Sequence, residues 1–314
     1  MPPIYPASMN DADQEKPSLL IDASIYIFQY YFSMPDNWFS EDKGYPTGAV
    51  YGYTTFLLRL LAEQKPKKIA ACFDESLGSC FRNKIYPNYK ISRPPADEDL
   101  KFQLEACREI TELVAIYSTS SKKYEADDLI GTLSKKLTRS KAPIAILTRD
   151  KDLGQLILRE QDYLWDYAKN QRSYSQQITE KFGVKPDQII DYLALVGDAI
   201  DDIPGVPGFG PKTVSALLNH HDCIDEIFNS VDRLHELPIR GAKNLANKLH
   251  EYRDQIMMAR ELTKIVSDIP IDISARDLEW RKEYIDETQT TEFCERMGFP
   301  RLASRFGSVF GWND

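Results

Sequence analysis

Length, composition and charge exclude several classes of protein. The chain has 314 residues, 42% hydrophobic and 28% charged, which fits a folded protein of two domains or one large α/β unit with an appendage. No run approaches the roughly 18 uncharged apolar residues of a membrane span, and the polar, acidic N-terminus lacks the pattern of a secretion signal. Five widely spaced cysteines without a C-x-x-C pair indicate reduced thiols in a cytoplasmic protein. Residues 1–17 are expected to be a loose tail.

Three short apolar runs, each ending in an aspartate, predict the strands of an α/β sheet. The runs are residues 18–22, 68–74 and 143–150. Stretches with helical periodicity lie between or after them, at residues 50–63, 99–117 and 126–137. Apolar runs separated by helices are typical of parallel strands that are buried on both faces. Ligands bind beyond the carboxyl ends of such strands, where Asp22, Asp74 and Asp150 would project.

The composition changes near residue 186. A helical run follows Pro186, a segment dense in glycine and proline covers residues 203–212, and the remainder is mostly helical in pattern. We therefore expect an α/β domain at residues 18–185 and a helical subdomain at residues 186–314.

Nine carboxylates occupy places where this organisation would gather them. They are Asp22, Asp74, Glu125, Asp127, Asp128, Asp150, Asp152, Asp198 and Asp201. Like charges packed together would repel and force several groups to stay protonated, so bound cations are the natural remedy. The four histidines lie at residue 220 or beyond, and ligation by oxygen alone selects magnesium or manganese. Two such ions about 4 Å apart can clamp a phosphodiester.

Each of these acids taken alone has a plainer interpretation. An aspartate after a strand is commonly a helix N-cap or a turn residue, and E-A-D-D at residues 125–128 is also a favourable first turn of a helix. Agreement between three strand ends and two helical clusters favours metal binding. Without the nine acids, the remaining acidic residues equal the 39 basic ones in number, so the net charge of −9 is no argument against a nucleic-acid partner.

Two further segments suit nucleic acid. Residues 77–96 contain no acidic residue and interleave aromatic rings with four cations, Arg82, Lys84, Lys90 and Arg93. Cations with aromatic rings neutralise phosphates and stack on unpaired bases, although a solvated loop is the alternative. The stretch from Gly205 to Thr213 resembles the hairpin of a helix-hairpin-helix motif, in which the backbone and a helix N-terminus hold a phosphate; the alternative is a plain corner between helices.

Together these segments closely resemble the 5′ nuclease family, which comprises the N-terminal 5′ to 3′ exonuclease domain of bacterial DNA polymerase I, its stand-alone relatives and phage flap endonucleases. The resemblance runs in order from about residue 18 to residue 310. Its motifs are L-L-I-D-A-S, P-T-G-A-V-Y-G-Y, F-D, F-R-N-K-I-Y-P-N-Y-K-I-S-R-P-P, Y-E-A-D-D-L-I, I-L-T-R-D-K-D-L-G-Q-L and L-V-G-D-A-I-D-D-I-P-G-V-P-G-F-G-P-K-T.

The resemblance implies roles for these residues. The first metal site would take Asp22, Asp74, Glu125, Asp127 and Asp128, and the second Asp150, Asp152, Asp198 and Asp201. A helical gateway above the site would use Tyr89, Lys90 and Arg93, with Arg82 and Lys84 as further DNA-binding residues. The hairpin would grip duplex DNA through Gly208, Gly210, Lys212 and Thr213, with a potassium ion joining backbone carbonyls to a phosphate.

The chain departs from the family pattern at three places. The family commonly carries an arginine near Gln29, and its usual D-G after the first strand is Asp22-Ala23 here. The usual S-D-N is Ile200-Asp201-Asp202, which adds a carboxylate beside the second metal site. Contacts with the substrate end and metal affinity are therefore expected to differ.

The resemblance implies a mostly parallel sheet flanked by helices, in a PIN-like 5′ nuclease fold, with a helical subdomain that contains the hairpin. The implied activity is 5′ to 3′ exonuclease or 5′ flap endonuclease action on DNA, dependent on two Mg²⁺ or Mn²⁺ ions and leaving 5′-phosphates, with Lys90, Arg93, Asp150 and Asp198 as catalytic residues. The implied enzyme is a nucleoid-associated, cytoplasmic monomer that acts on 5′ ends, flaps or RNA-DNA hybrids. The alternatives are a catalytically silent, structure-selective DNA-binding protein and a PIN-like RNase.

Overall fold

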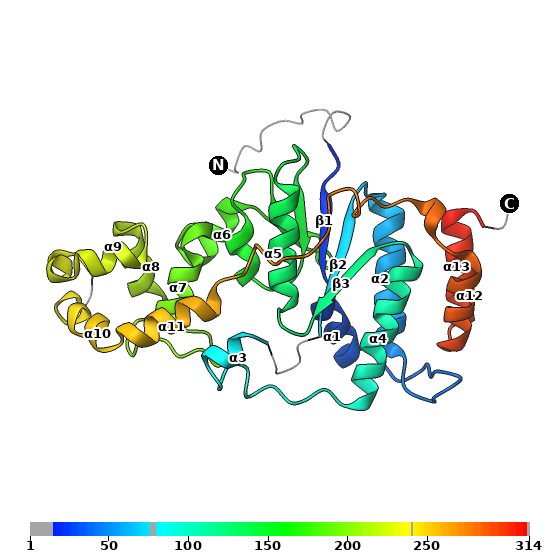
Figure 1. Cartoon of the computed structure of the whole chain (residues 1–314), viewed down its shortest axis with the longest axis horizontal. Helices are drawn as coiled ribbons and strands as arrows, with labels where there is room; N and C mark the ends of the chain where they lie inside the picture. The colour runs from blue at the N-terminus through cyan, green and yellow to red at the C-terminus, as the bar shows by residue number, and fades with distance from the viewer. Residues whose placement is uncertain (1–14, 76–79, 240, 313–314) are drawn as a thin grey trace, which may run out of the picture.

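A six-stranded sheet forms the centre of the protein (Figure 1). The structure, a computed structural model, describes residues 15–75, 80–239 and 241–312; most of the predicted tail and residues 77–79 of the basic segment lie outside these ranges. The strands are β1 (Ser18–Asp22), β2 (Ile69–Asp74), β3 (Tyr117–Ser121), β4 (Ile144–Leu147), β5 (Tyr163–Asp166) and β6 (Gln171–Ser173). Their order is β3-β2-β1-β4-β5-β6, and only β6 is antiparallel to its neighbour. The predicted, mostly parallel sheet is confirmed.

Alternate strand residues belong to two separate cores, because successive side chains of a strand point to opposite faces of the sheet. Leu19 and Ile21 lie in one core and Leu20 in the other, each at most 1% exposed. A strand that is buried on both faces stays apolar until it ends. This explains why β1 and β2 carry their first carboxylates at Asp22 and Asp74.

Helices cover both faces of the sheet (Figure 1). One core contains α1 (Ala23–Ser33), α2 (Gly48–Gln64), α4 (Glu98–Leu113), α12 (Glu287–Arg296) and α13 (Pro300–Phe310). The other contains α5 (Ala126–Leu137), α6 (Ser175–Phe182), α7 (Ile189–Val196), α8 (Pro211–His220), α9 (Ile224–Asn229), α10 (Leu245–Glu251) and α11 (Arg253–Thr263). Figure 1 shows α8 to α11 as an arm that extends away from the sheet. Among the described helices, none is long and apolar enough to cross a bilayer.

The C-terminal third differs from the single helical unit expected at residues 186–314. After α11 the chain returns to the sheet in an extended segment, where Glu279 forms an antiparallel bridge with Lys68. The Trp280 ring N–H donates to the carbonyl of Val114 at 2.9 Å. The last two helices, α12 and α13, then pack in the core of α2 and α4. Only the part before this return segment forms the arm.

Two element boundaries also differ from expectation. The helix predicted at residues 99–117 ends at Leu113, and the polar run Y-S-T-S-S that follows is the edge strand β3, which lacks the apolar pattern of a buried strand. Strand β4 ends at Leu147, so Asp150 and Asp152 do not share a strand face. Asp150 lies in the loop after the strand, and Asp152 is the first residue of a short 3₁₀ helix, η1 (Asp152–Leu156).

Candidate metal centre

The first two acids lie at the carboxyl ends of the adjacent parallel strands β1 and β2. Asp22 is also the N-cap of α1; it accepts hydrogen bonds from the Thr148 hydroxyl at 2.8 Å and the Ile25 backbone N–H at 3.4 Å. Asp74 accepts one from the Ala126 N–H at 2.7 Å. Burial and the nearby charge of Asp74 raise the pKa of Asp22 to about 7, and burial together with Glu125 raises the pKa of Asp74. Protonation is therefore favoured in the absence of a cation.

The start of α5 contributes the next three acids, in different environments. Glu125 is the N-cap and forms a capping box with Asp128. Asp127 has a pKa well above its ordinary value because of burial and the charges of Asp150 and Asp22. Asp128 is fully buried, and both of its oxygens accept hydrogen bonds from Arg82, each at 2.7 Å.

Arg82, which the sequence predicts as a further DNA-binding residue, lies in a buried ion-pair network. Its side chain is 3% exposed, and its guanidinium N–H groups donate to Asp128, Glu125 and the carbonyls of Leu262 and Lys264. This network joins the short helix α3 (Arg82–Ile85), the start of α5 and the end of α11. Lys84, two residues later, is exposed.

The second acid pair follows β4. The hydroxyl of Thr148 accepts a hydrogen bond from the Asp150 N–H at 2.9 Å, while it donates to Asp22. Asp150 in turn accepts one from the Asp152 N–H at 2.8 Å. Burial, Asp150 and Asp198 raise the pKa of Asp152 to about 8, and its Oδ1 atom is buried without a hydrogen-bond partner. A buried carboxylate oxygen without a donor is what a cation site requires.

The loop after α7 brings in the last two acids. Asp198 forms a two-residue antiparallel bridge with Ile203, with N–H to carbonyl distances of 2.9 and 2.8 Å. This closure requires a glycine nearby: a Cβ atom on Gly205 would lie 1.9 Å from the Val196 carbonyl oxygen. The loop thereby places Asp198 and Asp201 beside the earlier acids.

The gateway residues contact these acids directly. Lys90 Nζ lies 2.5 Å from Glu125 and 3.5 Å from Asp201, and Arg93 donates to Asp201 at 2.6 Å. The Tyr89 hydroxyl donates to Glu125 at 2.9 Å. Burial opposes the charge of both partners, but the ion pairs outweigh it, so the pKa of Lys90 is raised and that of Glu125 is lowered. The cations predicted to meet a phosphate are here paired with the acids.

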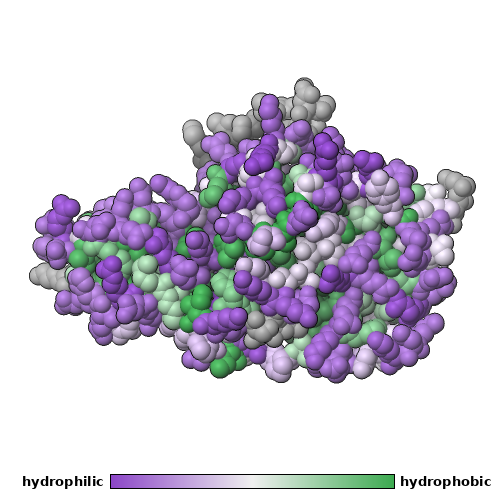
Figure 2. Space-filling view, in the orientation of Figure 1, coloured by the Kyte–Doolittle hydropathy of each residue, from purple (hydrophilic) through white to green (hydrophobic). Residues whose placement is uncertain are grey.

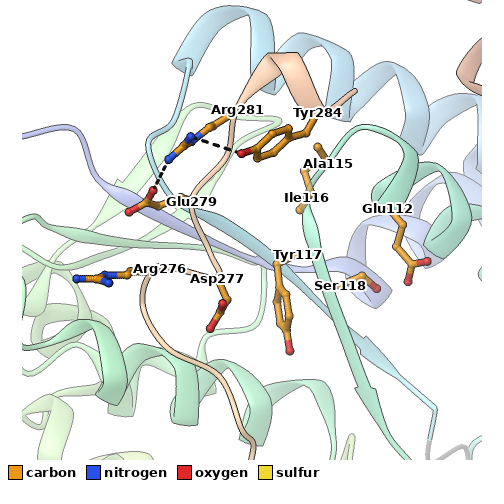
Figure 3. A pocket seen from close by; sticks show the side chains of 10 residues that line it. All are labelled: Glu112, Ala115, Ile116, Tyr117, Ser118, Arg276, Asp277, Glu279, Arg281 and Tyr284. Carbon is orange, nitrogen blue, oxygen red and sulfur yellow. Dashed lines mark hydrogen bonds and ion pairs between the residues drawn. The ribbon is translucent and has the colours of Figure 1, made fainter. Parts of the chain in front are cut away.

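Six of the nine carboxylates surround one small cavity of about 30 Å³. They are Glu125, Asp127, Asp150, Asp152, Asp198 and Asp201. A larger hollow of about 710 Å³ lies elsewhere, between the start of β3 at Tyr117 and the return segment at Arg276 to Tyr284 (Figure 3). Its charged side chains have both signs, with Arg281 paired to Glu279 at 3.3 Å.

The residues around the small cavity fit a divalent cation. Six carboxylates line it, which suits hard ions, and the unpartnered Oδ1 of Asp152 together with the raised pKa of this acid indicates missing positive charge. In the described part of the chain, no three acidic, histidine or cysteine side chains are already arranged as a metal-ligand set. Lys90 and Arg93 hold Glu125 and Asp201 instead, so these two acids would have to exchange partners to become ligands.

The hairpin has the backbone expected of a tight turn. Gly208 has φ +81°, in the left-handed region, and Gly210 is the N-cap of α8 with Pro211 at its first position. Lys212 is exposed and Thr213 is half-buried. The predicted turn opening a helix is therefore present.

Two residues that depart from the family pattern have local partners. Gln29 accepts a hydrogen bond from the Arg149 guanidinium at 3.1 Å. Asp202 accepts from both the N–H and the hydroxyl of Ser92, at 2.9 and 2.8 Å, and thus fastens the gateway to the acid loop. Asp202 follows Asp201 in the chain, and its carboxylate contacts the gateway.

Sequence reasoning missed Thr148, which joins Asp22 to Asp150. A polar residue directly after an apolar strand run was the available signal.

Comparison with known proteins places the chain in a family of nucleases. Residues 17–183 match the family model described as "5'-3' exonuclease, N-terminal resolvase-like domain", and residues 184–286 match "5'-3' exonuclease, C-terminal SAM fold". A 5'-3' exonuclease of Buchnera aphidicola is 36% identical over 94% of this chain and 99% of its own length. One of Aquifex aeolicus is 31% identical over 84% and 86%. DNA polymerase I of Bacillus subtilis is 32% identical, and the match covers 94% of this chain but 32% of the polymerase.

Solved structures share the fold at low sequence identity. The T5 D15 protein co-crystallised with metal ions has a TM-score of 0.64 at 15% identity, and covers 95% of this chain and 100% of its own. The catalytic core of Rad2 in complex with a DNA substrate has a TM-score of 0.62 at 15% identity, with 94% and 91% covered. The overall fold of this chain is therefore shared with known structures.

Proposed function

Because the chain belongs to the 5'-3' exonuclease family, we propose that it hydrolyses phosphodiesters in DNA at 5′ ends and flaps, leaving 5′-phosphates. The observation that carries the proposal is the cavity that six carboxylates surround, beside Lys90 and Arg93. A carboxylate cluster with adjacent cations is the arrangement that binds divalent ions and a phosphate together.

We assign the acids to two ion positions. Asp22, Asp74, Glu125 and Asp127 would hold one Mg²⁺ ion, and Asp150, Asp152, Asp198 and Asp201 the other. The contacts of Asp128 favour a supporting role, because Arg82 occupies both of its oxygens. Divalent ions, when bound, supply the acidification of water and the stabilisation of charge at phosphorus.

The protein's own groups would orient and neutralise the substrate. Once Glu125 and Asp201 turn to an ion, Lys90 and Arg93 are free to donate to the oxygens of the scissile phosphate. In the hydrolysis, water adds its oxygen to phosphorus and the 3′ oxygen leaves with a proton. The Tyr89 hydroxyl, 3.2 Å from Asp201, would keep that acid in place during the exchange.

The arm would bind the duplex beside the cleavage site. The turn at Gly208 and the N-terminus of α8 at Gly210 present backbone N–H groups to a phosphate. Lys212 and Thr213, at the first turn of α8, would add side-chain donors. This contact involves the phosphate backbone and is independent of sequence.

Cleavage of a 5′-flap substrate in magnesium tests the proposal. Asp150→Asn and Asp198→Asn should each lose activity by at least about a hundredfold, because each removes a negative charge from the cavity. Asp268→Asn, at an exposed acid outside the cavity, is the matched control. Full activity in both cavity variants would dismiss the site.

The two alternative functions give different results. Tight flap binding without cleavage in magnesium or manganese would indicate a silent DNA-binding protein. Preference for single-stranded RNA over flap DNA in a competition experiment would indicate an RNase.

A further inference from the structure

Two kinds of side-chain contact join the gateway segment, residues 89–93, to the loop that follows α7. The first kind uses an acid assigned to an ion position: Arg93 donates to Asp201 at 2.6 Å. The second kind uses Asp202, whose Oδ2 atom accepts hydrogen bonds from the Ser92 N–H at 2.9 Å and from the Ser92 hydroxyl at 2.8 Å. The described residues that line the small cavity include Asp201 but not Asp202. An ion bound there would therefore compete only for the first kind of contact.

The backbone on both sides of this junction lies in the left-handed region. Lys90 has φ +55° and Asp202 has φ +56°. Residues other than glycine adopt this region mainly where their surroundings hold them there. The Lys90 N–H donates to the Asp201 carbonyl at 3.0 Å, and the Ser92 contact with Asp202 follows directly along both segments. The direction in which the Lys90 side chain leaves the backbone therefore depends on this junction.

Ion binding would leave the gateway with fewer contacts. Under the proposed function, Glu125 and Asp201 turn from the gateway cations to an ion. The contact between Ser92 and Asp202 survives this exchange, because it uses neither of those acids. A segment that stays fastened keeps its cations in place for the phosphate at a lower entropic cost.

We propose that Asp202 is a positioning residue that keeps the gateway over the acids, through Ser92, after those acids have turned to an ion. The inference rests on the proposed function, because it concerns the ion-bound protein. The chain has aspartate at position 202, where the family pattern has asparagine. The two Ser92 donors lower the pKa of Asp202, and an ionised carboxylate is a stronger acceptor than an amide oxygen. The alternative role for this extra carboxylate is that of a further ion ligand.

Hydrogen exchange at the Lys90 amide, resolved by NMR, tests the inference in the absence of DNA. This amide donates to the Asp201 carbonyl, so it reports on the junction without being a donor to Asp202 itself. Asp202→Gly removes the acceptor, and glycine still adopts the left-handed backbone. In magnesium, the Lys90 amide should exchange at least about tenfold faster in this variant than in wild type, because a charged acceptor is lost. In EDTA, where the ion pairs remain, the difference should stay within about threefold.

Asp202→Asn distinguishes a positioning residue from an ion ligand. Asparagine keeps an oxygen that can accept from Ser92 and tolerates the left-handed backbone, so exchange at Lys90 should stay within about threefold of wild type. The magnesium concentration for half-maximal flap cleavage should stay within about twofold, because no ligand is lost. Ala115→Gly is the matched control, since it introduces a glycine at another left-handed residue, with φ +59°, and should match wild type in both measurements.

Equal exchange at Lys90 in wild type and Asp202→Gly, both in magnesium, would overturn the inference, because the contact would then hold nothing in place. A magnesium requirement at least about tenfold higher in Asp202→Asn would also overturn it, because Asp202 would then be a ligand. Absence of flap cleavage by wild type in magnesium would instead overturn the proposed function, and with it this role of Asp202.

Discussion

Arg82 donates a hydrogen bond of 2.7 Å to each carboxylate oxygen of Asp128, in the buried space between α3 and α5. The same guanidinium reaches the Leu262 and Lys264 carbonyls at the end of α11, each at 2.8 Å. The arm that we propose to bind DNA is thereby fastened to the acid cluster. Movement of α11 would therefore displace Arg82, and with it Glu125, because Arg82 also donates a hydrogen bond to Glu125.

Removal of either partner should destabilise the protein strongly. Arg82→Met or Asp128→Leu alone should cost about 3–5 kcal/mol of unfolding free energy, because each leaves an unpaired buried charge. The double variant should recover a large part of that loss, since neither member of the Arg82–Asp128 pair is then left without its partner and Lys90 still pairs with Glu125. Urea unfolding of wild type, the two single variants and the double variant measures the coupling energy between Arg82 and Asp128. Additive losses of unfolding free energy would contradict this coupling.

The acid cluster should make the metal-free protein less stable as pH rises. The pKa of Asp22 is raised from 3.8 to about 7 and that of Asp152 from 3.8 to about 8, so the folded state binds more protons than the unfolded state between these values. Unfolding free energy in EDTA should therefore be highest near the ordinary pKa and fall as pH rises through the raised pKa values, by on the order of a few kcal/mol.

Magnesium should remove most of that pH dependence, because a bound ion replaces the protons. Asp152→Asn should flatten part of the slope in EDTA, whereas the exposed control Asp268→Asn should not. Thermal or urea unfolding across the pH series measures this slope of unfolding free energy against pH, with magnesium and with EDTA. A flat profile in EDTA would show that the carboxylates do not repel one another.

The predictable part of the site is the part encoded by single segments. Asp22 and Asp74 were predicted because a strand that is buried on both faces stays apolar until it ends. The turn at Gly208 was predicted from its glycine and proline content. Each of these signals is local, so one sequence suffices.

The unpredicted features depend on chain segments that meet only in the fold. Arg82 is buried because the carbonyls of Leu262 and Lys264 arrive from about 180 positions further along the chain, and a basic residue in a loop has no local pattern that signals burial. The return segment and the packing of α12 in the core of α2 and α4 also depend on distant segments of the chain. Helical periodicity indicates which face of a helix is buried but not which core receives it.

Arg149 should supply the cation that the family commonly carries on α1. Its guanidinium donates a hydrogen bond to the Gln29 side chain at 3.1 Å. Arg149 is exposed and immediately precedes Asp150 in the chain. Arg149→Gly should lower kcat/KM on a flap substrate by about tenfold, mainly through KM, because a charge-assisted contact with the substrate end is lost.

Moving the cation from position 149 to position 29 distinguishes a contact with the substrate from an effect of Arg149 on local structure. Gln29→Arg combined with Arg149→Gly returns the cation to the helix and should restore most of the activity. An unchanged kcat/KM for Arg149→Gly would show that the cation does not contact the substrate.

Two glycines in neighbouring segments should respond differently to alanine. A Cβ on Gly205 would lie 1.9 Å from the Val196 carbonyl oxygen, so Gly205→Ala should force the Asp198 loop apart and cost at least about 3 kcal/mol of unfolding free energy.

A Cβ on Gly210 would meet no atom within 4 Å. Gly210→Ala should therefore cost less than about 1 kcal/mol, the typical loss at a helix N-cap. Its flap affinity should nevertheless fall several-fold in anisotropy titrations, because the added methyl group stands where the phosphate would approach the N-terminus of α8. Equal flap affinity for Gly210→Ala and wild type would place the duplex contact elsewhere on the arm.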